Sequence, residues 1–506
     1  MTYGLRVNYE TGDVEDQNQL NYIDLQSSSP LAGHIPGFPN LVGGVGIPGL
    51  NGTSRQVQLP RGLHLDPRLG VAYQLNAKTV IHSGFGIFHH PLAAWEQYPN
   101  ALGTTRTINS IAAQSDGVTP LFNLSNPFPS GLPAPYGNAA GLAIALGQNI
   151  TGPLRTQDIP YQANWSFDIQ RQLPLQLVVT AAYVGNVGVH LMTPIQFNQI
   201  PDADLSLGSK LISVVSNPFY GVIADPTSTL SLATVQYGQL LRPFPQFLNV
   251  KGINVGAGQS SYQAGQLTVE KRMSQGLAVL FGYTYSKAID NVGEMTSVAG
   301  TRNGPQDNYC LACDRSVSDQ NEPYTVRLAI RYELPFGPGK GLVNSGIAAK
   351  VFGGWSLGGF YTVDAGRPVA ASSPNNSSSL GGGSGMRPNA TGVSAALPGG
   401  PQICDSCLYF NTAAFTQTPQ YAFGNVSRYV PGVNNPTAAN VDTSIEKLTR
   451  INERFHVVFR AEMFNATNHV VFSGPTTSVT SATFGKIILS QSNAPRQVQF
   501  SLRLRF

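Results

Sequence analysis

Four cysteines are the residues of this 506-residue chain whose spacing most directly suggests chemistry. They form two CxxC pairs, Cys310 with Cys313 and Cys404 with Cys407. Four thiolates at such spacings can close a tetrahedral zinc site, whereas in an oxidising compartment the same residues form disulfides. Both pairs fall in long Gly/Pro/Asn/Ser-rich stretches, and we expect disulfides, with metal binding or free thiols as alternatives. Four cysteines allow three pairings, so the connectivity stays open.

The segment Gly354-Trp-Ser-Leu-Gly358 matches the GxSxG nucleophile elbow, which needs a strand, a sharp turn and then a helix to expose its serine. Here glycines precede Ser356 and a strand pattern follows it. We expect Ser356 to lie where a turn enters a strand, with its side chain directed to a polar interior. A secreted serine hydrolase using Ser356 is therefore an unfavoured alternative, and we expect that the chain is not an enzyme and has no catalytic residue.

Other ligand-like patterns are weaker. Asp202-Ala-Asp-Leu-Ser206 begins like a calcium loop, but Leu207 stands where the sharp turn needs glycine and Ser213 where a glutamate would complete the site. The eight histidines offer no better metal spacing than the adjacent His89 and His90. The sequence thus predicts no resident metal and no cofactor.

The composition is unusual for a water-soluble enzyme. Only 11% of the residues are charged, against about 25% in typical soluble domains. The chain has 54 glycines and 36 prolines, yet its hydrophobic content of 42% argues against simple disorder. The net charge of +4 includes no basic run, so nucleic acid is not expected as a partner. No apolar run reaches the roughly 18 residues of a membrane helix, so any membrane insertion must use strands.

Strand patterns recur along the chain, joined alternately by very short and very long connections. Tight turns are expected at 75–78, 173–175, 273–276 and 451–454. Long stretches separate the paired strands at 10–65, 89–160, 185–259, 287–323, 365–438 and 465–495. The twelve predicted strands are 3–9, 66–75, 79–88, 161–173, 175–184, 260–273, 277–286, 324–334, 355–364, 439–451, 454–464 and 496–506.

This alternation predicts an all-β, transmembrane antiparallel barrel with short periplasmic turns and long extracellular loops. If the chain ends in the periplasm at Phe506, every short turn also falls there. The connection 335–354 is longer than a tight turn but must lie on the same side, and it is the weakest join of this topology.

The final strand shows the two faces of such a wall. Val498, Phe500, Leu502, Leu504 and Phe506 fall on one face, because successive strand side chains point to opposite sides. Gln497, Gln499, Ser501, Arg503 and Arg505 fall on the other face.

The strand 454–464 repeats this pattern. Arg460 and Glu462 lie on the face opposite Phe455, Val457 and Phe459, and they are close enough along the strand to pair. An arginine facing mid-bilayer lipid costs about 2 to 4 kcal/mol. We therefore predict that Arg460, Glu462, Arg503 and Arg505 face a wet lumen.

Short segments across nearly the whole chain resemble, in order, the barrel of TonB-dependent outer-membrane transporters. The Oar-like group, common in soil acidobacteria, is the most similar. The segments are Leu65–Tyr73, Trp165–Pro174, Ala182–Gly185, Leu241–Phe247, Val269–Arg272, Tyr283–Asp290, Glu333–Gly337, Gly353–Trp355, Ala365–Pro368, Arg460–Asn465 and the terminal strand. Gly265 departs from the pattern, which has a large aliphatic residue there.

The resemblance implies a transporter of the Gram-negative outer membrane whose complete barrel has about 22 strands around a plug. Residues 1–506 would then be the C-terminal portion of one barrel domain, with about twelve strands. The N-terminus shows no secretory signal. We expect the signal peptide, plug domain, TonB box and N-terminal regulatory domain to be absent, so that this fragment alone is not transport-competent.

The same resemblance implies the partners. They are outer-membrane lipid, the barrel assembly machinery reading a C-terminal signal of Leu502, Leu504 and Phe506, the TonB complex only through the missing N-terminal part, and an unidentified oligosaccharide, peptide or chelate as substrate. Two alternatives besides the hydrolase stay open: a small autonomous porin-like barrel and a surface adhesin or structural β-protein.

Overall fold

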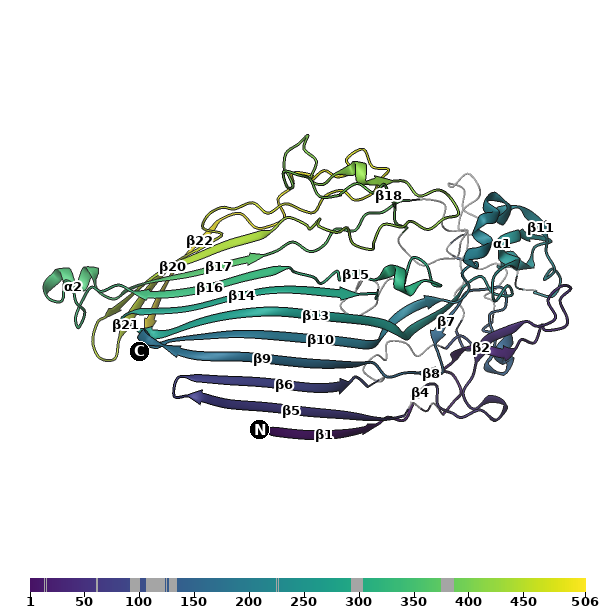
Figure 1. Cartoon of the computed structure of the whole chain (residues 1–506), viewed down its shortest axis with the longest axis horizontal. Helices are drawn as coiled ribbons and strands as arrows, with labels where there is room; N and C mark the ends of the chain where they lie inside the picture. Colours follow the sequence, from purple (N-terminus) through teal and green to yellow (C-terminus); the bar gives the residue numbers. More distant parts are fainter. Residues whose placement is uncertain are drawn as a thin grey trace.

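One large curved sheet makes up most of the regular structure (Figure 1). The computed structural model describes residues 1–506 except 13, 15, 61, 92–100, 106–122, 124, 127–133, 224, 226, 293–303 and 375–385. Twelve strands pair in one continuous antiparallel path, β1-β5-β6-β9-β10-β13-β14-β16-β17-β20-β21-β22. Their bounds are β1 (Thr2–Tyr9), β5 (Leu63–Asn76), β6 (Thr79–His89), β9 (Tyr161–Leu173), β10 (Leu177–Gln196), β13 (Val250–Ser274), β14 (Leu277–Asp290), β16 (Tyr324–Glu333), β17 (Trp355–Asp364), β20 (Ala438–Arg450), β21 (His456–Phe464) and β22 (Gln497–Arg505).

The predicted all-β class and the twelve predicted strands are confirmed, in the predicted order. Each strand pairs with the next one along this path, as an up-and-down wall requires. Among the described residues, β1 and β22 are the two ends of the path and do not pair with each other. The sheet is therefore an open wall with two free edges.

The short connections have backbone conformations that suit tight hairpins. Between β13 and β14, Gln275 has φ 51° and Gly276 has φ 78°. Two successive positive φ values characterise the turn whose twist matches that of paired strands, and glycine adopts such values without steric cost. Between β9 and β10, Leu175 and Gln176 also have positive φ, at 61° and 59°.

The predicted bounds of β10 and β13 are too short at the end away from these turns. We expected a loop over 185–259, but β10 continues to Gln196 and β13 begins at Val250. Register shifts between Val189 and Leu191, and again between Thr193 and Ile195, carry the pairing through this glycine-rich stretch. Bulges break the two-residue alternation, which is why the pattern in the sequence ends early.

The long connections fold into packed structure at the end of the sheet opposite the short turns (Figure 1). Among the described residues they contain four two-stranded sheets away from the wall. Three are β2 (Tyr22–Ser28) with β3 (Val42–Gly46), β11 (Val214–Ser216) with β12 (Thr234–Gln236), and β18 (Asn389–Ala390) with β19 (Phe415–Thr416), and the fourth is formed by β4 (Leu59–Pro60) and β8 (Thr156–Gln157). The other short strands are β7 (Ile150–Pro153), which pairs with β13, and β15 (Ser316–Val317), which pairs with β14.

Most buried apolar side chains lie in these outer loops. One cluster gathers around Phe410, Val430 and Ile487, and another around Val45, Ile144 and Phe247. The described residues form two α-helices, α1 (Tyr237–Leu240) in the outer loops and α2 (Gly346–Phe352) in the connection between β16 and β17 at the short-turn end. None of the described helices is both long and apolar enough to cross a membrane.

Candidate substrate-binding surface

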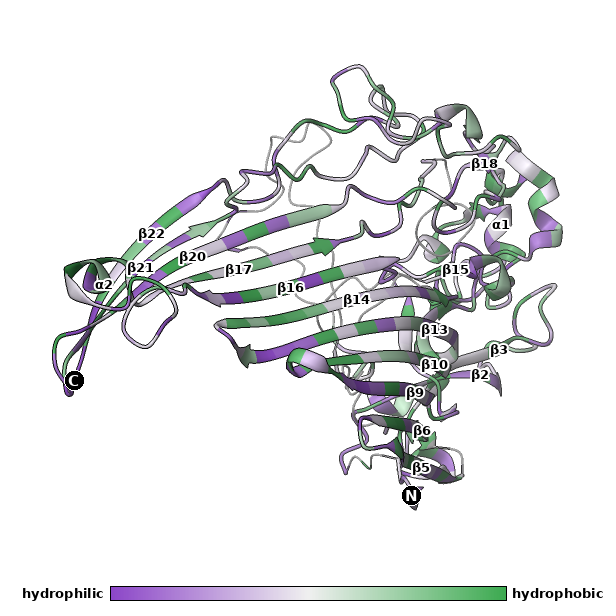
Figure 2. Ribbon diagram, turned by 60° about the vertical axis from the view of Figure 1, so that its left-hand side comes forward, coloured by the Kyte–Doolittle hydropathy of each residue, from purple (hydrophilic) through white to green (hydrophobic). Residues whose placement is uncertain are grey.

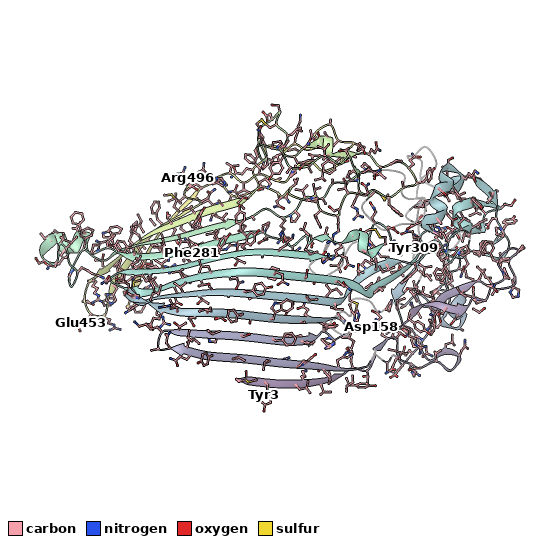
Figure 3. The ribbon with its side chains drawn as sticks, viewed as in Figure 1. Tyr3, Asp158, Phe281, Tyr309, Glu453 and Arg496 are labelled. Atoms are coloured by element: carbon pink, nitrogen blue, oxygen red, sulfur yellow. A yellow bond between two sulfur atoms is a disulfide. The ribbon has the colours of Figure 1, made fainter. Side chains whose placement is uncertain are left out.

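The strand register divides the sheet into one apolar and one polar face. Phe281 of β14 lies opposite Val269 of β13 and Leu328 of β16, and Leu328 lies opposite Tyr361 of β17. Directly opposed residues in antiparallel strands share a face, so the apolar set continues from strand to strand. The alternation of apolar and polar positions is visible along the ribbon in Figure 2, and Phe281 is labelled in Figure 3.

The four charged residues expected in the lumen all lie on the polar face. Arg460 pairs in register with Ser501 and Glu462 with Gln499, while Arg503 lies opposite Val458 and Arg505 opposite His456. Arg460 Nη2 and Glu462 Oε1 are 2.7 Å apart, and Gln499 Nε2 donates to the other Glu462 oxygen at 3.2 Å.

Opposite charges also pair across strands of this face. Arg331 of β16 reaches Glu446 of β20 at 3.3 Å, and Arg327 of β16 pairs with Asp364 of β17. A hydrogen bond of 2.9 Å also joins His82 Nδ1 of β6 to Asp168 of β9. The arginines are about half exposed, so each such pair contributes only about 0 to 1 kcal/mol to stability. Their main effect is to line the face with fixed, alternating charge.

A hollow of about 330 Å³ lies where this face meets the outer loops. Its polar lining residues include Thr362, Asp364, Asn440 and Asp442, and they stand among apolar ones that include Ala438, Phe464 and Val471. Asp442 Oδ1 accepts hydrogen bonds from Asn440 Nδ2 and from the backbone N–H of Asn465, both at 2.9 Å. The hollow thus presents amide donors and carboxylate acceptors held in place by their neighbours.

Two largely buried ion pairs fasten the outer-loop segment 386–430, one to another outer loop and one to Asp290 at the end of β14. Arg387 Nη1 lies 2.6 Å from Asp314 Oδ1, and the two side chains are only 7% and 4% exposed. Gln306 joins this contact, because its Oε1 accepts from the Arg387 backbone N–H at 2.8 Å and its own N–H donates to Asp314 Oδ2 at 3.3 Å. Arg428 forms a second buried pair with Asp290. The segment 386–430 is therefore held against 304–316.

Residues 1–499 match the family described as the outer membrane beta-barrel domain. The chain belongs to that family. It is accordingly a barrel protein of the bacterial outer membrane. No curated protein matches the chain.

The barrel is also similar to several solved structures. They include the outer membrane transporter YddB from Escherichia coli, with 9% identity and a TM-score of 0.42 over 88% of this chain and 40% of that one. The ferric-catecholate import receptor Fiu from Escherichia coli K12 has 10% identity and a TM-score of 0.36, over 99% of this chain and 41% of Fiu. The ferric preacinetobactin receptor BauA from Acinetobacter baumannii has 9% identity and a TM-score of 0.36, over 92% of this chain and 37% of BauA. The chain thus spans about two fifths of the length of these proteins.

The outer loops of the barrel contain a pair of close carboxyl groups. Gln199 Nε2 donates to Asp307 Oδ1 at 2.7 Å and to Asp202 Oδ1 at 3.2 Å. Burial, and then the charge of Asp307, raise the pKa of Asp202 above its ordinary value of 3.8. Burial also lowers the pKa of Arg242, in the same loop, to about 10. Nothing in the sequence pattern indicated the contact between Gln199 and Asp307, since these partners are 108 residues apart.

In this barrel each CxxC pair is a disulfide within itself, Cys310 with Cys313 and Cys404 with Cys407. Both lie in the outer loops, and the first belongs to the short 3-10 turn Leu311–Asp314 that supplies Asp314 to its buried ion pair. Within the described part of the chain, no three His, Cys, Asp or Glu side chains converge as a metal site would require.

Ser356 is the second residue of β17, on the polar face between Glu333 and Glu446 of the neighbouring strands. Helix α2 precedes it, whereas an elbow has its helix after the serine. At the C-terminus of the barrel, Leu502, Leu504 and Phe506 are all exposed, and the first two extend the apolar face at the free edge of β22. Gly265 lies on the same face between Tyr183 and Tyr285, with open space beside it.

Proposed function

We propose that this chain forms part of the wall of a TonB-dependent, Oar-like transporter of acidobacterial type, with its polar face lining the lumen. The observation that carries the proposal is the separation of a mostly apolar from a mostly polar face of the sheet, combined with long connections that, in the described part of the chain, pack together at the end opposite the tight turns. The segments that resemble this group of transporters support the finer assignment. The apolar face contacts outer-membrane lipid, and the assembly machinery reads the strand that ends at Phe506.

The free edges of β1 and β22 support a wall that is completed by further strands. If other strands paired with these edges, the backbone N–H and C=O groups of β1 and β22 would have hydrogen-bond partners, which lipid cannot provide. In that arrangement the plug and the TonB box belong to the rest of the transporter, and coupling to TonB passes through them. Reading the DNA upstream of Met1 tests this: an in-frame signal, plug and further alternating strands are expected, and an unrelated upstream frame would contradict it.

The hollow beside Asp364 and Asp442, in which carboxylate and amide groups stand among apolar side chains, is the proposed substrate contact. Its amide and carboxylate groups suit a ligand rich in hydroxyl or amide groups, such as an oligosaccharide or a peptide, and a chelate is the third class to test. Uptake of that ligand, rather than its chemical conversion, is the proposed role, so Ser356 serves no catalytic purpose.

Binding to the purified protein in detergent, measured by calorimetry against oligosaccharides, peptides and ferric chelates, tests this site. Thr362→Trp fills the hollow and is expected to weaken binding about tenfold or more, which equals about 1.4 kcal/mol. Thr180→Trp places the same bulk on the polar face four strands away from Thr362 and should leave affinity unchanged. Equal effects of the two variants would refute the site.

Three measurements separate the other functions. Single-channel conductance from the refolded chain would favour an autonomous pore, which requires β1 and β22 to pair. Adhesion of cells to glycan or matrix without uptake would favour an adhesin. A hydrolytic activity abolished by Ser356→Ala would favour the enzyme.

A further inference from the structure

Helix α2 presents apolar side chains outward at the short-turn end of the sheet. Ile347 is 82% exposed, Phe352 57% and Val351 52%. With 3.6 residues per turn, these side chains and Ala348 occupy one side of the helix, while Ala349 on the other side is buried. Leu342 and Val343, in the approach to the helix, are exposed as well. Such a concentration of exposed apolar groups in one connection indicates a surface that contacts a partner or a membrane.

Two residues of the apolar face fix the helix in place. Trp355 Nε1 donates to the carbonyl of Val351 at 3.1 Å. Lys447 Nζ donates to the carbonyls of Lys350 at 3.1 Å and Gly353 at 3.3 Å, and to that of Val351. The ammonium group thereby satisfies the carbonyls at the helix C-terminus, where a positive charge is favourable.

The position of these two anchors ties the helix to the outside of the wall. Trp355 and Lys447 lie opposite each other in register on the apolar face, and the ammonium group of Lys447 stands 5.0 Å from the centre of the Trp355 ring. The Trp355 ring contacts Phe459, and Phe459 stacks on Phe500 of β22. An aromatic row thus borders the apolar face where it reaches α2, as at a boundary between membrane and water.

We propose that α2 is an interfacial element that inserts its apolar side into the phospholipid headgroup region of the periplasmic leaflet. The apolar face of the sheet continues through Trp355 into Val351 and Phe352, so one lipid surface can cover both. Lys350, exposed at the edge of the apolar side, meets the anionic headgroups. The inference rests on the proposed contact of the apolar face with lipid, and it is independent of transport.

Nitroxide labels on engineered cysteines test the proposal in the whole chain, refolded into vesicles of phosphatidylethanolamine and phosphatidylglycerol. The four native cysteines are paired, so a label reports only the new position. Ile347→Cys is the test site. Tyr283→Cys, in the middle of β14 on the apolar face, is the lipid control, and Glu453→Cys, in the tight turn between β20 and β21 at the same end as α2, is the water control (Figure 3).

Accessibility to oxygen and to a water-soluble nickel complex distinguishes the outcomes. A label at 347 that collides with oxygen more than with nickel, as at 283, supports insertion into lipid. Strong nickel collision, as at 453, would overturn the proposal in favour of a hydrated helix. Low access to both agents would overturn it in favour of a protein covering. If the label at 283 collides with nickel more than with oxygen, the apolar face of the sheet does not contact lipid, and the proposed function is contradicted instead.

Discussion

The buried pair of Arg387 and Asp314 gives the sharpest prediction about the outer loops. Asp314→Asn keeps the shape of the side chain but removes the negative charge, leaving a guanidinium group that is only 7% exposed without its counter-ion. Removing one partner of a buried ion pair costs about 3 to 5 kcal/mol. The loss falls on the docking of 386–430 against 304–316, because the strands of the sheet do not take part in this contact.

Native-state hydrogen exchange measures this docking free energy. The informative backbone amides are those of Arg387, which donates to Gln306, of Val426, which donates to Pro388, and of Ser373, which donates to Met386. Since about 1.4 kcal/mol corresponds to a factor of ten, exchange at these amides should accelerate by about a hundredfold or more.

A more exposed pair provides the matched control, since Arg460 is 43% and Glu462 20% exposed. Glu462→Gln disrupts the contact with Arg460, which should cost only about 0 to 1 kcal/mol and change nearby exchange by less than about fivefold. Replacing both buried partners, with Arg387→Met and Asp314→Leu together, should restore much of the protection, because no unpaired charge remains. If Asp314→Asn changes exchange no more than Glu462→Gln does, the buried pair does not hold the loops together.

Three further predictions concern the wall, the disulfides and acidity. Leu267→Arg on the apolar face should lower the free energy of unfolding of the vesicle-inserted protein by about 2 to 4 kcal/mol in urea titration. Thr268→Arg on the polar face should change it little, and equal losses would contradict the assignment of the two faces. Peptide mapping without reductant should recover Cys310 joined to Cys313, whereas a peptide bridging the two CxxC motifs would disprove that pairing. Because the folded-state pKa of Asp202 is raised, its contribution to stability is complete below pH 3.8 and is lost as pH rises through the raised value. The protection factors of its loop amides, corrected for the intrinsic pH dependence of exchange, should therefore be larger in acid, and Asp202→Asn should abolish that dependence.

The sequence predicted the wall well because a strand with two chemically different faces leaves a two-residue alternation. That alternation located all twelve strands and placed Arg460 and Glu462 on one face. It ended too early in β10 and β13, where bulges between Val189 and Ile195 shift the alternation while the backbone pairing continues.

The outer loops could not be predicted in the same way. Their contacts join residues far apart in the chain, as when Gln199 meets Asp307 or Arg387 meets Asp314, and such pairs follow no period. Helix α2 was also missed, because its seven residues are too few to establish a helical pattern, and only the length of the connection 335–354 marked it as irregular.

The location of the buried apolar side chains has a consequence for how this protein melts. Clusters such as those around Phe410 and Val45 release their apolar surface to water when the loops unfold, which raises the heat capacity. The apolar face of the sheet, in contrast, is not covered by other parts of the protein. It is in contact with detergent or lipid before the strands separate, and it remains so afterwards. Calorimetry should therefore separate two transitions, one with a large heat-capacity step that is insensitive to acyl-chain length, and one whose midpoint follows the thickness of the bilayer.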